Sequence, residues 1–264
     1  MSNSNEAWRR SKILTRQGAK LLESSKDPVL EVFDSLPRCS QSERLVHSRR
    51  KISKHQNMLD TNMFESYLEN LWSRVPEEKM ISYAYLDCLW FSLYKDESAK
   101  SKVLDWIKRK QIFKRKYVFV PIVCWRHWSL LILCHFGEKG QSRTKKPCML
   151  LLDSLQELDP KRLEPDIRRF VHDLYRSEGR KEKDEFIYDI PLLIPQVPQQ
   201  KNGEECGIFV LYFLYLFLQS APESFKQEGY PYFLNKEWFK LEDLECFRKE
   251  LDSISRCKDV IDID

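Results

Sequence analysis

Apolar residues recur every three or four positions in four segments of the chain, which places them along one face of a helix. In the first of these, Phe64, Leu68 and Leu71 follow one another at this spacing. The four segments are 60–72, 82–93, 100–110 and 163–177. We expect an amphipathic helix in each.

Four other segments are rich in β-branched and large apolar residues, a composition typical of buried strands. They are 117–124, 128–136, 148–153 and 186–194. A polar and basic stretch, 137–146, separates the second from the third. We expect these segments to form a sheet, with 137–146 as a loop.

The segment 206–219 is apolar nearly all round, the pattern of a helix buried at the centre of a domain. Pro191, Pro195 and Pro198 stop regular structure before it, and the polar sequence QQKNGEE of 199–205 leads into it. Cys206 lies where the polar segment meets the apolar one. The buried helix is therefore expected to begin at a thiol.

Charge separates the N-terminal part of the chain from the rest. Residues 1–55 carry twelve Lys or Arg and six Asp or Glu, a net charge of +6 in a 264-residue chain whose net charge is +4. We expect a flexible basic extension over 1–55, a folded domain over 56–252 and a tail over 253–264. The extension either directs the chain to the nucleus or binds a nucleic acid or an acidic partner. The alternative is a solvated arm that binds no partner.

The absence of a secretory signal in the first residues makes us expect an intracellular protein, nuclear or cytoplasmic, and the longest apolar run is too short to cross a bilayer. The eight cysteines form no CxxC pair, so we expect reduced thiols. Cys124, His127, Cys134 and His135 do not follow the spacing of a structural zinc site. We therefore expect neither a metal nor another cofactor.

A thiol at the start of a buried helix meets unpaired backbone N–H groups and the positive end of the helix dipole, both of which favour the nucleophilic thiolate. Nucleophilic catalysis also requires a base and a group that orients it. His127 lies at the start of an expected strand, and Asp153 closes the next strand. The hypothesis is a triad of Cys206, His127 and Asp153.

Structural interpretations compete with this hypothesis. Asp153 alone is typical of a strand-end cap, and Gln200 of a solvated loop. Asn202 and Glu205 have the spacing of a capping box, which would place Cys206 deeper in the first helical turn and make the segment purely structural.

The motifs His127-Trp128, Asp153-Ser154, Gln199-Gln200, Asn202-Gly203 and Cys206-Gly207, in this order, resemble the ubiquitin-like-protein-specific cysteine peptidases, the SUMO-protease group of the adenain-like clan. The resemblance covers about residues 55–250. It implies an α+β, papain-like fold, in which helices flank a central mixed sheet and the nucleophile starts a buried helix. It also implies a thiol peptidase or isopeptidase that cleaves after the C-terminal Gly-Gly of a ubiquitin-like protein through a thioester.

The resemblance assigns roles by matching position. Cys206 would attack the carbonyl, His127 would carry the proton, Asp153 would hold the imidazole, and Gln200 would donate to the oxyanion with the Cys206 N–H. The expected substrate-binding residues are Trp128, Met58, Gly203 and Gly207. Trp128 would form part of the channel for the Gly-Gly tail, and the loop 137–146 would add a basic rim near the site.

Two positions depart from the family pattern. Glu205 stands before the cysteine where the family has Asp, and Met58 stands where an aromatic residue covers the diglycine. SUMO is the first expected substrate, while NEDD8, ubiquitin, a binding module that has lost its chemistry, and a protein acyltransferase of the same fold stay open. Precursor maturation and deconjugation are equally compatible with the sequence.

The chain ends in alternating aliphatic and acidic residues, KDVIDID. Val260–Ile263 has the pattern of a SUMO-interacting motif, which adds an extended strand to a partner's sheet; the alternative is an ordinary frayed terminus. The expected partners are SUMO or another ubiquitin-like protein and its conjugates, with no membrane, no nucleic acid beyond the basic extension, and a monomeric chain.

Overall fold

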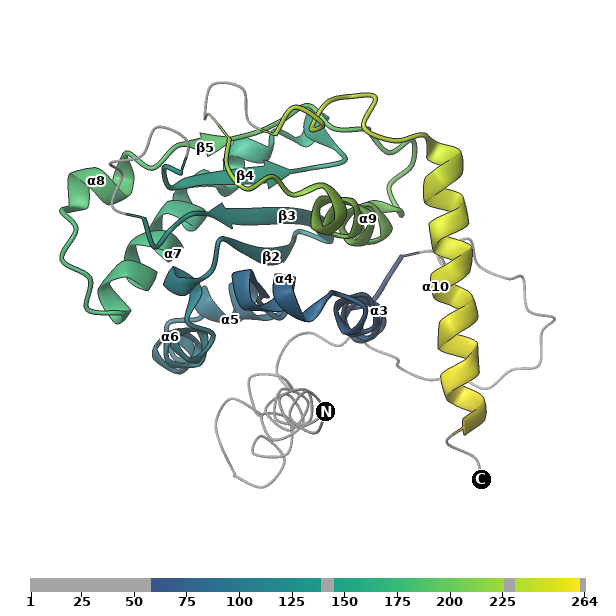
Figure 1. The fold of residues 1–264 in the computed structure, drawn as a ribbon, viewed down its shortest axis with the longest axis horizontal. Coiled ribbons are helices and arrows are strands. Elements are labelled where there is room, and N and C mark those ends of the chain that lie inside the picture. The colour runs from purple at the N-terminus through teal and green to yellow at the C-terminus, as the bar shows by residue number, and fades with distance from the viewer. Residues whose placement is uncertain (1–57, 139–144, 226–230, 262–264) are drawn as a thin grey trace, which may run out of the picture. The chain divides into compact units, whose positions relative to one another are not determined.

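A five-stranded sheet organises the part of the chain that the computed structural model describes, residues 58–138, 145–225 and 231–261. In spatial order the strands are β1 (Tyr83–Tyr85), β2 (Tyr117–Cys124), β3 (His127–Cys134), β4 (Cys148–Leu152) and β5 (Leu192–Leu193). The β2–β3 and β3–β4 pairs are antiparallel, whereas β1 and β5 run parallel to their neighbours. The sheet is therefore mixed (Figure 1).

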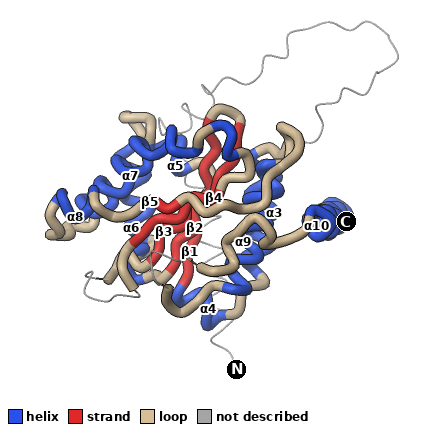
Figure 2. The backbone as a smooth tube through the Cα atoms, turned by 90° about the horizontal axis from the view of Figure 1, so that it is seen from above, coloured by secondary structure: helices blue, strands red, loops and turns tan. Residues whose placement is uncertain are grey.

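Helices cover both faces of this sheet. The helices of the described residues are α3 (Thr61–Ser73), α4 (Glu77–Ser82), α5 (Trp90–Tyr94), α6 (Lys100–Arg109), α7 (Glu164–Ser177), α8 (Asp184–Tyr188), α9 (Cys206–Ser220) and α10 (Leu241–Ile261), with short 3-10 turns η1 (Ile112–Lys114), η2 (Gln156–Leu158) and η3 (Pro160–Leu163). Figure 2 shows α5 and α7 on one side of the sheet and α9 and α3 on the other. The predicted α+β fold, with helices flanking a central mixed sheet, is confirmed.

The β3 strand lies at the centre of the core, and its side chains alternate between two buried faces. Trp128, Leu130 and Ile132 belong to the hydrophobic cluster that contains the residues of α9, and Leu131 is buried outside that cluster. Because both faces are covered, the strand reads in sequence as one continuous apolar run. Eleven of the fifteen residues of α9 are buried, which explains its all-round apolar pattern.

Two predicted elements were wrong. The segment 82–93 is not one helix, because Tyr83–Tyr85 pairs with β2 as an edge strand and helix begins only at Trp90. The segment 186–194 starts as the end of α8 and contributes only Leu192–Leu193 to the sheet. In the first segment, pairing with a neighbouring strand overrides the local pattern of apolar residues, whereas in the second a helix replaces the first part of the expected strand.

Helix α10 is fixed to α3 by polar contacts and packs against α9. The Tyr67 hydroxyl donates to Asp252 at 2.9 Å, and Arg74 pairs with Glu250 at 2.7 Å. The helix continues to Ile261, through the start of the segment expected as a tail. The backbone of Val260–Ile261 is thus helical rather than extended, so strand addition by this motif would require the end of α10 to unfold.

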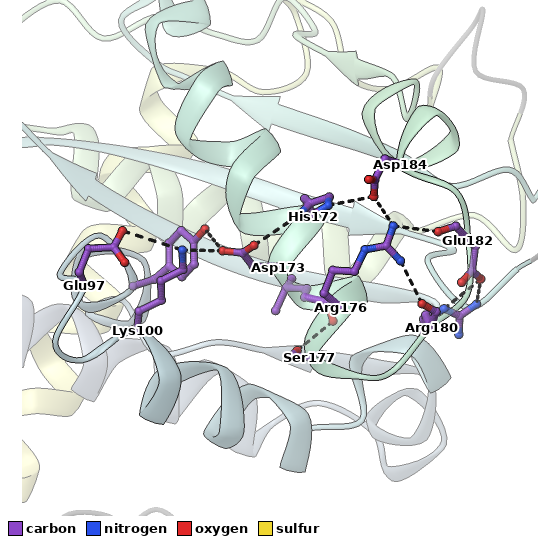
Figure 3. A network of polar contacts seen from close by, with 11 residues as sticks. Glu97, Lys100, His172, Asp173, Arg176, Ser177, Arg180, Glu182 and Asp184 are labelled. Carbon is purple, nitrogen blue, oxygen red and sulfur yellow. Dashed lines mark hydrogen bonds and ion pairs between the residues drawn. The ribbon is translucent and has the colours of Figure 1, made fainter.

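A polar network joins α6, α7 and the segment that leads into α8 (Figure 3). Lys100 pairs with Asp173 at 2.7 Å, and His172 Nε2 lies 3.0 Å from Asp184 Oδ1. Arg176 also bonds Asp184. His172 therefore belongs to a structural network on α7.

Within the described residues, no helix is both long and apolar enough to span a membrane.

Candidate active site

Helix α9 begins at Cys206, as the pattern predicts. The preceding residue, Glu205, makes no side-chain capping bond, and Asn202 Oδ1 accepts from Glu204 N at 3.0 Å. The alternative capping box, which would have moved Cys206 into the helix, does not form. The thiol thus lies at the helix start, where the first backbone N–H groups have no partner within the helix.

His127 and Asp153 meet because β3 and β4 are antiparallel neighbours. His127 starts β3, and Asp153 directly follows the last residue of β4. Their side chains join through His127 Nε2 and Asp153 Oδ1 at 2.9 Å, and both residues are buried. Two residues 26 positions apart in sequence are brought together by strand pairing alone.

Three donors surround the Asp153 carboxylate. Ser129 Oγ donates to Oδ2 at 2.7 Å and the Leu155 N–H donates to Oδ1 at 2.7 Å, in addition to His127. Burial by itself would raise the pKa of Asp153, but the hydrogen bonds from His127, Ser129 and Leu155, with the charge of His127, hold it below its ordinary value of 3.8. The carboxylate is therefore ionised at neutral pH.

His127 bonds Asp153 through Nε2, and Cys206 is close enough to influence the ionisation of the imidazole. Burial lowers the pKa of His127, but the hydrogen bonds to Asp153 and Cys206, together with their negative charge, outweigh burial and raise the pKa from 6.5 to about 9. Since Nε2 is engaged by Asp153, Nδ1 is the ring nitrogen left for the sulfur. The three side chains form one continuous relay from carboxylate to imidazole to thiol.

Gln200 lies beside this relay and is also buried. Its Oε1 accepts from Ser154 Oγ at 2.6 Å, and its Nε2 donates to the Asn202 carbonyl. A side-chain amide has two N–H donors, so one remains after the bond to Asn202. The solvated-loop interpretation of Gln200 is wrong, because the amide is buried and held at both ends.

Two of the residues expected to bind substrate are packed against the protein itself. Trp128 is 3% exposed and stacks on Phe64, with ring centroids 4.1 Å apart. A Cβ at Gly207 would lie 3.0 Å from Leu59 Cβ and 3.5 Å from Trp128 Cδ1, so the glycine allows α9 to approach both. Packing explains both residues without a ligand.

Met58 and Gly203 are placed differently. Met58 is half-buried, and its sulfur lies 3.7 Å from an Arg126 guanidinium nitrogen. Arg126 belongs to the tight turn just before His127. A Cβ added at Gly203 would meet no atom within 4 Å, so this glycine lies in open space on the loop before Cys206.

Ser129 and Ser154 are functional candidates that the sequence reasoning missed as site residues. Ser129 is 1% exposed and bonds Asp153, and Ser154 is 1% exposed and bonds Gln200. One signal was available for Ser129, which lies two positions after His127 and therefore on the same face of β3. Serine is otherwise too common in loops for its spacing to indicate such a role.

The loop after β3 starts far from His127. It follows Cys134, seven residues along the strand from His127, or about 23 Å at roughly 3.3 Å per residue. The expectation that 137–146 forms a basic rim near the site stays a prediction, because residues 139–144 lie outside the described residues. The same separation prevents His127 from sharing a zinc ion with Cys134 and His135.

One group of potential metal ligands occurs in the described part of the chain, formed by Glu65, Asp87 and Cys88. It includes no member of the relay. Burial, followed by the charge of Asp87, raises the pKa of Glu65 to about 8, and burial raises the pKa of Cys88 well above its usual range. The raised pKa values favour the protonated forms of Glu65 and Cys88 at neutral pH.

Comparison with known proteins identifies relatives of the chain. Residues 44–257 match the Ulp1 protease family, C-terminal catalytic domain. The Arabidopsis thaliana protein named "Probable ubiquitin-like-specific protease 2A" is 25% identical over 76% of this chain and 29% of its own length. "Ubiquitin-like-specific protease 1D" of the same plant is 31% identical over 54% of this chain and 26% of its own length.

One solved structure, described as a de-sumoylating protease, superposes with a TM-score of 0.51 at 17% identity and covers 72% of this chain and 75% of that one. This likeness concerns the fold. In both plant relatives the matched part is less than a third of the whole protein.

Proposed function

The chain belongs to the Ulp1 protease family, and from this membership we propose that it is a cysteine peptidase that cleaves after the C-terminal Gly-Gly of a ubiquitin-like protein. The observation that supports the proposal most strongly is the buried relay from Asp153 through His127 to Cys206. The motif resemblance and the family membership agree.

The relay supplies the parts of thiol catalysis. Cys206 attacks the carbonyl of the terminal glycine and forms a thioester, while His127 gives its proton to the leaving amine. Asp153 holds the imidazole orientation and stabilises its charge. Water then hydrolyses the thioester with His127 as the base, which releases the ubiquitin-like protein and restores the thiol.

The oxyanion of this reaction forms next to the sulfur. The backbone N–H of Cys206 at the helix start and the remaining Nε2–H of Gln200 are the proposed donors. One donor lies at the start of α9, and the other belongs to an amide that is hydrogen-bonded at both ends. Both donors therefore need to move little during the reaction.

SUMO is the substrate that we propose first, because the motifs are those of the SUMO-protease group; the names of the plant relatives support the wider ubiquitin-like class. NEDD8 and ubiquitin are the alternatives, and deconjugation and precursor processing both use the same bond cleavage. Met58 lies against Arg126, beside the turn that leads to His127, and is proposed to cover the diglycine. Trp128 is proposed to form part of the channel for the Gly-Gly tail, although it is only 3% exposed.

The binding-module and acyltransferase alternatives make different predictions. A module that only binds has no need for an ionised carboxylate bonded to a cationic imidazole beside a thiol, so the relay favours the enzyme. An acyltransferase would form the same thioester but with an acyl donor in place of a protein C-terminus. Labelling by protein probes separates these cases.

The test is covalent labelling of the purified chain by SUMO, NEDD8 and ubiquitin that carry a C-terminal electrophile. We expect one probe to add its mass at Cys206, read by intact mass and peptide mapping. Labelling by none of the three in a folded protein would contradict the proposed activity. Equal labelling at the exposed Cys246 would indicate unspecific thiol reactivity.

Gln200→Ala is expected to lower kcat about 10²–10³-fold with little change in KM, because an oxyanion donor acts in the transition state. Steady-state cleavage of the labelled ubiquitin-like substrate measures both constants. Gln219→Ala, which removes an exposed amide at the end of α9, is the matched control and should leave both unchanged. A loss confined to KM would assign Gln200 to substrate binding.

A further inference from the structure

The Gln200 side chain is held at both ends of its amide by groups whose chemistry is fixed. The Asn202 carbonyl can only accept, so the amide atom that faces it is the nitrogen. The other amide atom is then Oε1, and Ser154 Oγ, 2.6 Å away, must be its donor. The Ser154 hydroxyl is therefore the donor in its bond to Gln200.

The backbone holds these segments together independently of the hydroxyl. Gln200 N donates to the Ser154 carbonyl at 2.9 Å, and Gln199 Nε2 donates to the Asp153 carbonyl at 3.0 Å. Gln199 Oε1 also accepts from the Gln156 N–H at 2.8 Å. Removing the Ser154 hydroxyl therefore leaves the loop docked and affects chiefly the orientation of the Gln200 amide.

From this arrangement we infer that Ser154 is a positioning residue, which holds the Gln200 amide so that its free N–H faces the oxyanion. The inference rests on the proposed peptidase function. Two consecutive residues at the end of β4 then serve the two halves of the reaction, since Asp153 orients the base and Ser154 orients the oxyanion donor. The buried position of Ser154, 1% exposed, is consistent with this role because water cannot replace the hydroxyl without rearrangement.

The kinetic test is a double-mutant cycle of Ser154→Ala and Gln200→Ala. Ser154→Ala alone is expected to lower kcat about tenfold with KM nearly constant, the effect of one lost neutral hydrogen bond on a donor that Asn202 still holds. In the Gln200→Ala background the same change should lower kcat no further. An equal tenfold loss in both backgrounds, or no loss in either, would overturn the role.

A spectroscopic test does not depend on turnover and uses the full chain. The side-chain amide pair of Gln200, identified in a ¹⁵N–¹H spectrum by its absence from Gln200→Ala, should shift or broaden in Ser154→Ala. Ser129→Ala is the matched control, because this equally buried serine bonds Asp153 instead, and it should leave the pair in place. An unmoved pair in Ser154→Ala refutes the positioning role even in an active enzyme, whereas a moved pair in an inactive one would locate the failure in the proposed function.

Discussion

Cys206→Ser is expected to abolish turnover, with a loss of kcat on the order of 10⁶-fold, the scale seen when a catalytic nucleophile is removed. The serine hydroxyl is far less acidic than the thiol, so His127 and the start of α9 cannot supply an ionised nucleophile. Binding of the ubiquitin-like protein should be retained, because Cys206 is buried and offers little surface for docking. Cleavage assays and a binding titration on the same protein measure the two effects.

Cys246→Ser is the matched control for this variant, since Cys246 is an exposed free thiol on α10. It should cleave at the rate of the wild type. Residual turnover of Cys206→Ser within a hundredfold of the wild type would show that another group is the nucleophile. A loss of substrate binding together with turnover would instead point to misfolding, which a thermal unfolding curve detects.

The long elements of the fold were predictable from sequence because each has one unambiguous pattern. Asp60 caps α3 by accepting from the Met63 N–H at 2.8 Å, and the apolar face of 60–72 is the face that packs. The β2, β3 and β4 strands carry continuous apolar runs because both faces are covered. Such patterns depend on residues that are neighbours in sequence, so the elements they predict are found in the folded structure.

The short elements could not be predicted in this way. Tyr83–Tyr85 has helical spacing with the residues after it and becomes a strand only because β2 offers an edge. Leu192–Leu193 is two residues long and is defined by its pairing with β4. Both depend on contacts between distant segments, which a local pattern does not contain.

The contact between His127 and Asp153 was predictable for a related reason. Cys206, His127 and Asp153 each stand at an element boundary, and antiparallel pairing of β3 with β4 brings two boundaries to the same end of the sheet. The contacts of Ser129 and Ser154 could be found only from the side-chain positions in the structure.

Asp153→Asn is expected to lower kcat about 10⁴-fold, the size of effect known for the equivalent change in a serine-protease triad. The amide cannot stabilise a positive imidazole, and its NH₂ group favours the wrong tautomer of His127. The pKa of His127, about 9 in the wild type, should fall toward its ordinary 6.5, because hydrogen bonding to the carboxylate and its charge are both lost. An NMR titration of His127 measures this fall in pKa. The limb of the pH–rate profile that reports the ionisation of His127 should move to lower pH by the same amount.

Stability should respond to pH in a defined window. A raised His127 pKa stabilises the folded state fully below pH 6.5 and the effect is lost as pH rises through about 9. A lowered Asp153 pKa stabilises it above 3.8 and the effect is lost as pH falls through the folded value. The wild type should therefore exceed Asp153→Asn in free energy of unfolding most clearly between pH 3.8 and 6.5.

Asp105→Asn is the control for this comparison, because it makes the same chemical change at an exposed position on α6. Its activity and its stability profile should match the wild type across the whole pH range. If the His127 titration were unchanged in Asp153→Asn, the carboxylate would not be the group that holds the imidazole charged. The relay would then reduce to a Cys–His pair, in which Cys206 alone keeps His127 protonated and the meeting of the two strand ends serves packing instead of proton transfer.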